Sequence, residues 1–266
     1  MLRLPFERVW GSHSIDPHDP VLSLYECMAC GLEWFSPLRL GEGHFYAELE
    51  RDGAYYEGTR WEFGFMATRL KPSDTVLDLG CGDGAFLRRI RTTVSHAVGF
   101  DFNPDALDRL ASEGFETLSG DLATVARDNE GRFDVVTAFH VLEHLDDVRT
   151  FVTTAAPMLK SGGTFIASMP NRDRLRLDDV EPLDFPPHHA SRWSTTQLGR
   201  LADETDLTLL ETRHEPTKLK TQVHVLGARA LRAMRREPGE AGAPSLGHQL
   251  EHRHEGLAIL GVFRKR

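Results

Sequence analysis

The sequence has few cysteines, no long apolar run and fewer basic than acidic residues. It contains 3 cysteines in 266 residues, an odd number without a framework pattern, so structural disulfides are not expected. No stretch approaches the roughly 18 consecutive apolar residues of a membrane span, and no apolar run typical of a signal peptide follows Met1. Lys and Arg number 31 against 40 Asp and Glu, a formal net charge of −9, which disfavours a nucleic-acid groove. We therefore expect a cytoplasmic protein whose partner is neither a nucleic acid nor a membrane.

Short apolar segments alternate with helix-like segments in the middle of the chain. The predicted strands are rich in β-branched and aromatic residues and lie at 75–79, 96–101, 133–139 and 163–168. The stretches between them have the spacing of amphipathic helices, as at Phe86, Leu87 and Ile90. This succession predicts an α/β fold with a mainly parallel sheet, helices on both faces and a ligand at the carboxyl ends of the strands.

The parts of the chain outside this centre are less regular. Residues 1–45 are rich in Pro, Gly and His and form a predicted N-terminal segment. We expect one domain over 46–266, with insertions at about 171–193 and 215–254. The other predicted elements are a helix at 46–70, strands at 207–212 and 257–264, and a basic helix at about 219–236.

The stretch VLDLGCGDGAFL, residues 76–87, is a predicted strand that breaks into a glycine-rich turn and continues as a helix. It fits the dinucleotide fingerprint G-x-G-x-x-G/A through Gly80, Gly82 and Ala85, and Asp101 ends the next predicted strand. Only glycine lets a backbone approach a ligand so closely. The turn is therefore a candidate cofactor site.

Two carboxylates in this turn decide between cofactors. A dinucleotide places a dianionic pyrophosphate at the helix N-terminus, where Asp78 and Asp83 repel it. A ligand with a sulfonium and an ammonium group is compatible with both, and Asp101 can accept hydrogen bonds from two ribose hydroxyls. S-adenosylmethionine is that ligand. An NAD(P)-dependent oxidoreductase and a non-catalytic cofactor-binding domain are the alternatives.

Further motifs follow in order over about residues 50–210: GFD, SGDL, FDVVTAFHVLEHLDD and LKSGGTFIASMPN. Together with the glycine turn they resemble the class I S-adenosylmethionine-dependent methyltransferases. Within these, the chain is similar to the small-molecule branch of ubiquinone-type O-methyltransferases and of methyltransferases from bacterial metabolite and sugar pathways. The resemblance implies a Rossmann-like seven-stranded sheet with an antiparallel last strand. It also implies a small-molecule acceptor, with oxygen favoured over nitrogen or carbon, and leaves the oligomeric state open.

The resemblance implies roles for individual residues. The methionine portion is assigned to Asp78, Gly80, Gly82 and Gly84. Asp101 binds the ribose, and Phe102 packs on the adenine. Asp121 bonds the adenine amino group, with Leu122 beside it, although a turn residue after Gly120 is the simpler interpretation of Asp121 alone.

Residues of the predicted N-terminal helix complete this cofactor site. Arg60 can pair with the methionine carboxylate, although a surface cation is an equal alternative. Trp61 or Tyr56 can cover the site.

The segment HVLEH, from His140 to His144, also fits the H-x-x-E-H signature of zinc metalloproteases, with Glu143 as the base. It follows directly on a predicted strand instead of lying within a helix, and LEH is what the methyltransferase pattern has here. We therefore expect His140 to line the cofactor site rather than to bind zinc.

The segment CMACG is half of a zinc ribbon. Cys27 and Cys30 lack a second cysteine pair, and His13 and His18 are the candidates to complete four ligands. A degenerate knuckle packed by apolar residues is the alternative, and we assign no metal. Cys81 in the glycine turn needs no chemistry of its own.

An oxygen acceptor usually needs a general base, and histidine has a suitable pKa. His188 and His189 in the segment PPHH are the leading candidates, and His144 is the next. Each is also explained as a structural loop histidine. Trp193 is expected to form a wall of the acceptor site or to pack the insertion on the core.

Overall fold

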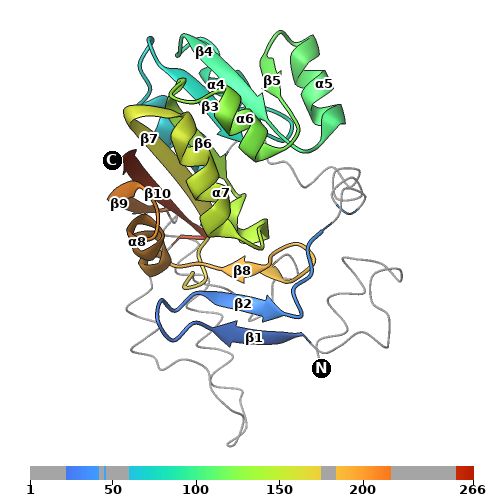
Figure 1. Cartoon of the computed structure of the whole chain (residues 1–266), viewed down its shortest axis with the longest axis vertical. Helices are drawn as coiled ribbons and strands as arrows, with labels where there is room; N and C mark the ends of the chain where they lie inside the picture. The colour runs from blue at the N-terminus through green and yellow to red at the C-terminus, as the bar shows by residue number, and fades with distance from the viewer. Residues whose placement is uncertain (1–21, 42–44, 46–59, 175–183, 217–255) are drawn as a thin grey trace, which may run out of the picture.

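The central element of the structure is a seven-stranded sheet in the order β5-β4-β3-β6-β7-β10-β9 (Figure 1). The computed structural model describes residues 22–41, 45, 60–174, 184–216 and 256–266. The strands of this sheet are β3 (Thr75–Leu79), β4 (His96–Phe100), β5 (Glu116–Leu118), β6 (Phe133–Phe139), β7 (Leu159–Pro170), β9 (Leu207–His214) and β10 (Ala258–Lys265). Strands β3 to β7 pair in parallel, whereas β10 is antiparallel to both β7 and β9. The predicted α/β sheet with an antiparallel last strand is confirmed.

Helices cover both faces of this sheet, as predicted. In the described part of the chain they are α3 (Trp61–Ala67), α4 (Ala85–Ile90), α5 (Pro104–Ser112), α6 (Leu122–Asp128), α7 (Val148–Ala155) and α8 (Thr195–Asp203). Residues of α6, α7 and α8 pack into one hydrophobic core, and residues of α3 and α4 pack into a second one. Helix α3 occupies part of the helix predicted at 46–70, of which 46–59 lie outside the described residues. The basic helix predicted at 219–236 also lies outside them.

Polar residues fix where several of these helices begin. The side chain of Asn103 accepts hydrogen bonds from the amides of Asp105 and Ala106 at the start of α5. Ser194 and Gln197 form a capping box at the start of α8. These side chains satisfy amides that have no partner inside the helix, so the sequence sets the helix boundaries locally.

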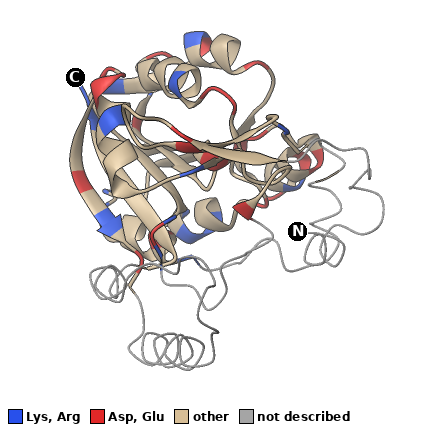
Figure 2. Cartoon of the chain, turned by 90° about the horizontal axis from the view of Figure 1, so that it is seen from below, with Lys and Arg blue, Asp and Glu red and all other residues tan. Residues whose placement is uncertain are grey.

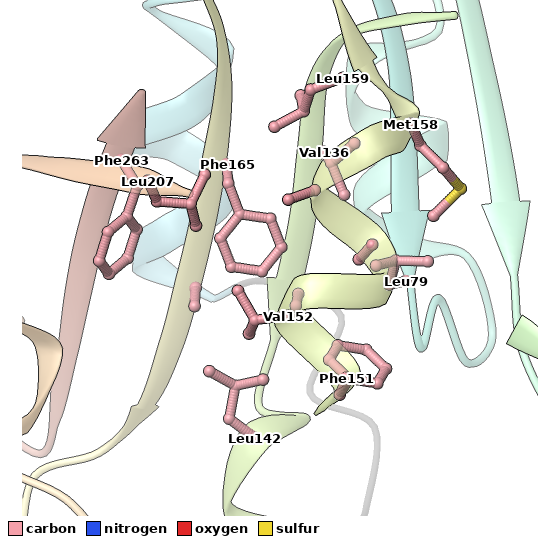
Figure 3. Packing of buried hydrophobic residues seen from close by; sticks show 14 of the residues in the cluster. Leu79, Val136, Leu142, Phe151, Val152, Met158, Leu159, Phe165, Leu207 and Phe263 are labelled. Carbon is pink, nitrogen blue, oxygen red and sulfur yellow. The ribbon is translucent and has the colours of Figure 1, made fainter. Parts of the chain in front are cut away.

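Successive residues of the central strands pack into different cores. On β3, Leu77 and Leu79 belong to the first core and Val76 to the second. On β7, Phe165 belongs to the first core and Ile166 to the second. Figure 3 shows the first core, in which Phe165 lies between the strands and α7. Because side chains of a strand alternate between faces, a run of apolar residues is required where both faces are covered.

A second, three-stranded sheet lies beside the first, in the order β1-β2-β8 (Figure 1). Its strands are β1 (Ser23–Glu26), β2 (Glu33–Ser36) and β8 (Ser191–Arg192). The sequence did not predict them because β1 is exposed throughout and has no alternation. Strand β8 belongs to the insertion predicted at 171–193, so that insertion is joined to the N-terminal segment. The domain boundary proposed after residue 45 stays a prediction.

The order of the strands locates the candidate site. The chain runs from β3 outward to β5 and then returns to β6 on the other side of β3. In open parallel sheets, ligands bind outside the carboxyl ends of the strands at such a reversal. Acidic and basic residues are interspersed over the described chain (Figure 2). None of the helices in the described ranges has the length and apolar character needed to cross a bilayer.

Candidate functional site

A glycine-rich turn joins β3 to α4 at this edge of the sheet. Gly80, Gly82 and Gly84 have φ values of 72°, 52° and 81°, which strongly favour glycine. A Cβ on Gly84 would stand 2.1 Å from Cδ2 of Leu110, and one on Gly80 would stand 2.6 Å from a methyl of Val141. The turn is therefore held closely between α5 and the segment that follows β6.

The backbone amides of this turn donate hydrogen bonds inside the protein. Those of Gly80 and Cys81 donate to the carbonyl of Phe100, at 2.8 and 3.1 Å. That of Gly82 donates to Oδ2 of Asp101 at 2.8 Å. These three amides of the turn are therefore engaged within the protein and hold the turn against the end of β4.

Asp78 lies at the end of β3, buried beneath the turn. Its Oδ1 accepts a hydrogen bond of 2.6 Å from the hydroxyl of Thr137 on β6. Burial raises the pKa of Asp78 to about 7; the hydrogen bond from Thr137 opposes this rise, and the charge of Asp101 adds to it. A cationic ligand group beside Asp78 would stabilise the ionised carboxylate.

Asp101 follows β4, and each of its carboxylate oxygens accepts one backbone amide. Oδ2 accepts from Gly82 and Oδ1 from Asn103, both at 2.8 Å. A carboxylate has about four lone pairs, so the side chain can accept further hydrogen bonds. Phe102 is 70% exposed, and its ring stands edge-on to that of Phe100 at 5.2 Å between centroids. A carboxylate with remaining acceptor capacity and an exposed aromatic ring are therefore adjacent.

Asp121 caps helix α6. Its Oδ2 accepts from the amide and the hydroxyl of Thr124, at 2.9 and 3.1 Å. Leu122 is half-buried and packs against the first core. The capping contacts account for Asp121 without any ligand, so its assignment to adenine stays a prediction.

Helix α3 is tied to the end of β6 by a buried carboxylate. Arg60 is half-buried at the N-cap of α3, and Glu62 in the first turn is 1% exposed. Oε1 of Glu62 lies 2.8 Å from Nε2 of His140. Tyr56, the other predicted cover of the site besides Trp61, lies outside the described residues.

His140 lies between two buried carboxylates, with its backbone in the left-handed region at φ 55°. Its Nδ1 is 3.3 Å from Oε1 of Glu143, opposite the contact with Glu62. Burial opposes the imidazolium, but the contacts with Glu143 and Glu62 outweigh it and raise the pKa of His140. Burial also opposes both carboxylates, but the contact with His140 lowers the pKa of Glu62 and helps to lower that of Glu143 to about 2. His140 therefore links α3, through Glu62, to the segment that follows β6.

The three predicted catalytic histidines lie together. His144 ends the 3₁₀ turn η1 (Leu142–His144), and His188 and His189 precede β8. The ring of His144 is 4.6 Å from that of His188 and 5.0 Å from that of His189, and the last two stack at 4.3 Å. The amide of Ala190 donates to the carbonyl of Glu143 at 2.8 Å and fixes the two segments together. His144 lies on the segment whose Val141 packs against the glycine turn, and His188 and His189 meet it from the segment before β8.

The neutral state of His144 follows from its surroundings. Burial lowers the pKa of His144 to about 4, although the charge of Glu143 works in the opposite direction. Its Nδ1 is in hydrogen-bond contact with the carbonyl of His188, which can only accept, so Nδ1 carries the proton. The lone pair is on Nε2.

Comparison with known proteins identifies the family of this chain. The sequence profile of a family described as methyltransferase domain matches residues 60–212, more than half of the chain and all of the elements from α3 to α8. The chain belongs to this methyltransferase family. Its methyl donor is S-adenosylmethionine, and the acidic glycine turn lies within the matched residues.

Several relatives of this methyltransferase are known. It is 32% identical over 105 residues to the ubiquinone biosynthesis O-methyltransferase of Marinobacter nauticus, covering 36% of this chain and 44% of that protein. It is 29% identical over 149 residues to the enzyme of the same name from Vibrio parahaemolyticus, covering 50% of this chain and 63% of that protein. The chain therefore spans about half the length of the curated relatives that it matches.

Solved structures show the same fold. A methyltransferase from Archaeoglobus fulgidus that depends on S-adenosylmethionine aligns with a TM-score of 0.53 at 15% identity, over 84% of this chain and 100% of that one. Another from Mesorhizobium loti aligns with a TM-score of 0.53 at 17% identity, over 77% and 97%. The identification confirms the predicted class and cofactor and removes the oxidoreductase alternative.

Outside the catalytic core of the methyltransferase, Cys27 and Cys30 lie on the turn between β1 and β2. The amide of Cys27 donates to the carbonyl of Leu32, and that of Gly31 donates to the carbonyl of Cys27. Hydrogen bonds from the backbone of Ala29 and Cys30 lower the pKa of the Cys27 thiol. His13 and His18, the other two candidate ligands at this knuckle, lie outside the described residues.

Several polar residues of the site were not predicted from the sequence. Thr137 and Glu62 are separated in the chain from their partners Asp78 and His140, and no motif marks them. Asp184 precedes the histidine pair by a few residues, a proximity that could have marked it. Trp193 is buried in the first core, where its Nε1 donates to Ser191 at 2.9 Å; it packs the insertion on the core.

Proposed function

We propose that this methyltransferase transfers the methyl group to an oxygen atom of a small molecule, such as a phenolic or sugar hydroxyl. The histidine cluster carries this proposal, because it gathers three imidazoles, two of them buried, at the segment whose Val141 packs against the glycine turn. Two relatives named ubiquinone biosynthesis O-methyltransferase support oxygen as the acceptor atom.

We place the cofactor along the carboxyl edge of β3, β4 and β6. Asp101 would bind the ribose and Phe102 the adenine ring, with Leu122 and Asp121 beyond it. The methionine portion would lie against the turn, with these residues near its charged groups: Arg60, Asp78, Gly80, Gly82, Gly84 and His140. In this placement the sulfonium faces the end of β6.

Methyl transfer is an in-line displacement in which a carbon–oxygen bond forms as the carbon–sulfur bond breaks. The acceptor oxygen has to lie about 3 Å from the methyl carbon, opposite the sulfur. It must also lose its proton, and S-adenosylhomocysteine leaves as the second product. His144, His188 and His189 are the side chains that we place around this oxygen.

Calorimetric titration with S-adenosylhomocysteine tests the cofactor site. We expect binding by the wild type and at least about tenfold weaker binding by Asp101→Asn, because hydrogen bonds to a charged group contribute about 1.5–3 kcal/mol. Asp105→Asn, an exposed residue in the first turn of α5, is the matched control and should bind as the wild type does. Equal affinities of all three proteins would contradict the ribose assignment.

Mass spectrometry of reactions with phenols, sugars and amines tests the acceptor. A gain of one methyl group on hydroxyl compounds supports the proposal. Methylation of amines alone would overturn it. Cofactor binding without turnover on any acceptor would favour the non-catalytic alternative.

A further inference from the structure

The histidine cluster has the composition of a metal site. His144, His188 and His189 each offer a ligand atom, and these atoms lie within 4.8 Å of one another. His188 and His189 are both 6% exposed. Zinc bound by three histidines keeps a fourth position for water or substrate and has Zn–N distances of about 2.0–2.1 Å. In a tetrahedral site with these bonds the nitrogens lie about 3.4 Å apart, so binding requires the three rings to draw closer together.

Two of these rings have a carbonyl or a carboxylate beside the nitrogen that would face away from an ion. A ligating imidazole usually engages its other nitrogen with a carbonyl or a carboxylate, which fixes the tautomer. Nδ1 of His144 meets the carbonyl of His188, and Nδ1 of His189 is 3.7 Å from Oδ1 of Asp184. Nη2 of Arg174 contacts both oxygens of Asp184 at 2.6 Å and holds that carboxylate in place.

A buried negative charge lies beside the cluster. Glu143 is 1% exposed, and its Oε1 is 4.0 Å from Nε2 of His144. Neither oxygen of Glu143 has a partner in hydrogen-bond geometry among the described residues; its nearest basic group is the imidazole of His140 at 3.3 Å, which also contacts the buried carboxylate of Glu62. Two buried carboxylates that share one imidazole favour a further cation nearby, since burial of carboxylate charge is unfavourable without compensation.

We propose that His144, His188 and His189 bind one divalent transition-metal ion of the zinc class. Neutral imidazole nitrogens suit such ions, whereas carboxylate and carbonyl oxygens suit magnesium and calcium. The fourth position takes water or, if the proposed function holds, the acceptor oxygen. An oxygen bound to the ion releases its proton to solvent more readily, because the cation stabilises the alkoxide or phenolate. The histidines then act as ligands and not as proton acceptors.

Metal titration of the full chain tests this site without any activity measurement. The protein, with its purification tag removed, is treated with a chelator, dialysed and titrated with Zn²⁺ by calorimetry and with Co²⁺ by absorption spectroscopy. We expect one ion at this site and a cobalt spectrum of nitrogen and oxygen ligands, without the charge-transfer band of a thiolate. The double variant His188→Ala/His189→Ala should lose this spectrum.

Two further variants separate the site from other metal-binding groups. His96→Ala removes an exposed imidazole on β4 that pairs with Glu116, and it should leave the titration unchanged. Cys27→Ser/Cys30→Ser removes the thiols of the knuckle, and it should also retain the cobalt spectrum. His188→Gln, which keeps much of the side-chain volume, replaces the double variant if that protein fails to fold, as judged by circular dichroism.

The outcomes distinguish this proposal from the proposed function. No ion on the wild type, an ion retained by the folded histidine variants, or an ion lost only with the cysteines would overturn the metal site. Metal binding without methylation of any hydroxyl compound would contradict the proposed function and leave the metal site intact.

Discussion

The substitution Asp78→Asn should change how the stability of this methyltransferase depends on pH. The side chain is 4% exposed, and its pKa is raised from 3.8 to about 7 by burial, against the hydrogen bond from Thr137 and with a contribution from Asp101. A carboxyl group whose pKa is higher in the folded than in the unfolded state binds protons more tightly when folded. Its contribution to stability is therefore fully present below the pKa of the unfolded state, and it is lost as the pH rises through the pKa of the folded state.

The magnitude follows from the two pKa values. Each pKa unit corresponds to about 1.36 kcal/mol, so ionisation of Asp78 costs about 4 kcal/mol over the whole range. Between about pH 5 and about pH 8 the loss is about 2.5 kcal/mol. Asparagine keeps the shape and can accept the Thr137 hydrogen bond, but it has no charge. Between these two pH values, the unfolding free energy of the variant should therefore rise by about 2.5 kcal/mol relative to that of the wild type.

Urea denaturation of the cofactor-free proteins, followed by tryptophan fluorescence at a series of pH values, measures this difference. Comparing the variant with the wild type at each pH cancels the titration of all other groups. Asp108→Asn, an exposed position on α5, is the control and should follow the wild type. The quantity compared is the unfolding free energy of Asp78→Asn minus that of the wild type. If it stays constant with pH, or falls as the pH rises, the reasoning is refuted.

Three further substitutions test the fold that positions the site. Gly84→Ala places a Cβ 2.1 Å from Leu110 at φ 81° and should cost about 1–3 kcal/mol of unfolding free energy; an unchanged melting temperature would contradict the packing of the turn. Phe165→Ala removes a fully buried ring from the first core and should cost about 3–5 kcal/mol in urea denaturation, whereas a loss below about 1 kcal/mol would mean that the site collapses around the cavity. Ser194→Ala removes the capping box of α8 and should lower the unfolding free energy by about 1 kcal/mol in urea denaturation. An unchanged unfolding free energy would mean that the cap is not formed.

The strands and the cofactor turn were predictable because their signals are local. The apolar runs at 75–79 and 133–139 coincide with β3 and β6, since a strand covered on both faces is apolar at most of its positions. The glycines of the turn are identifiable because their left-handed φ values and the closeness of Leu110 and Val141 exclude other residues. Strand β7 is longer than the predicted 163–168 at both ends, because its pairing with β6 and β10 extends it.

The small sheet and its consequences were not predictable in this way. Strand β1 has no apolar alternation, and β8 has only two residues, so both depend on pairing with β2. That pairing brings the insertion back toward the end of β6. His188 and His189 are thereby placed beside His144.

The sequence by itself determined the α/β class, the cofactor and the residues of the acidic glycine turn, because strand periodicity and turn chemistry act over a few neighbouring positions. Only the tertiary structure decided which polar groups meet. Thr137 reaches Asp78 across two strands, Glu62 reaches His140 from a helix, and the three histidines converge from two distant segments. These contacts depend on how the packed elements bring together side chains that are far apart in the sequence. A pattern of neighbouring residues does not show which distant residues will meet.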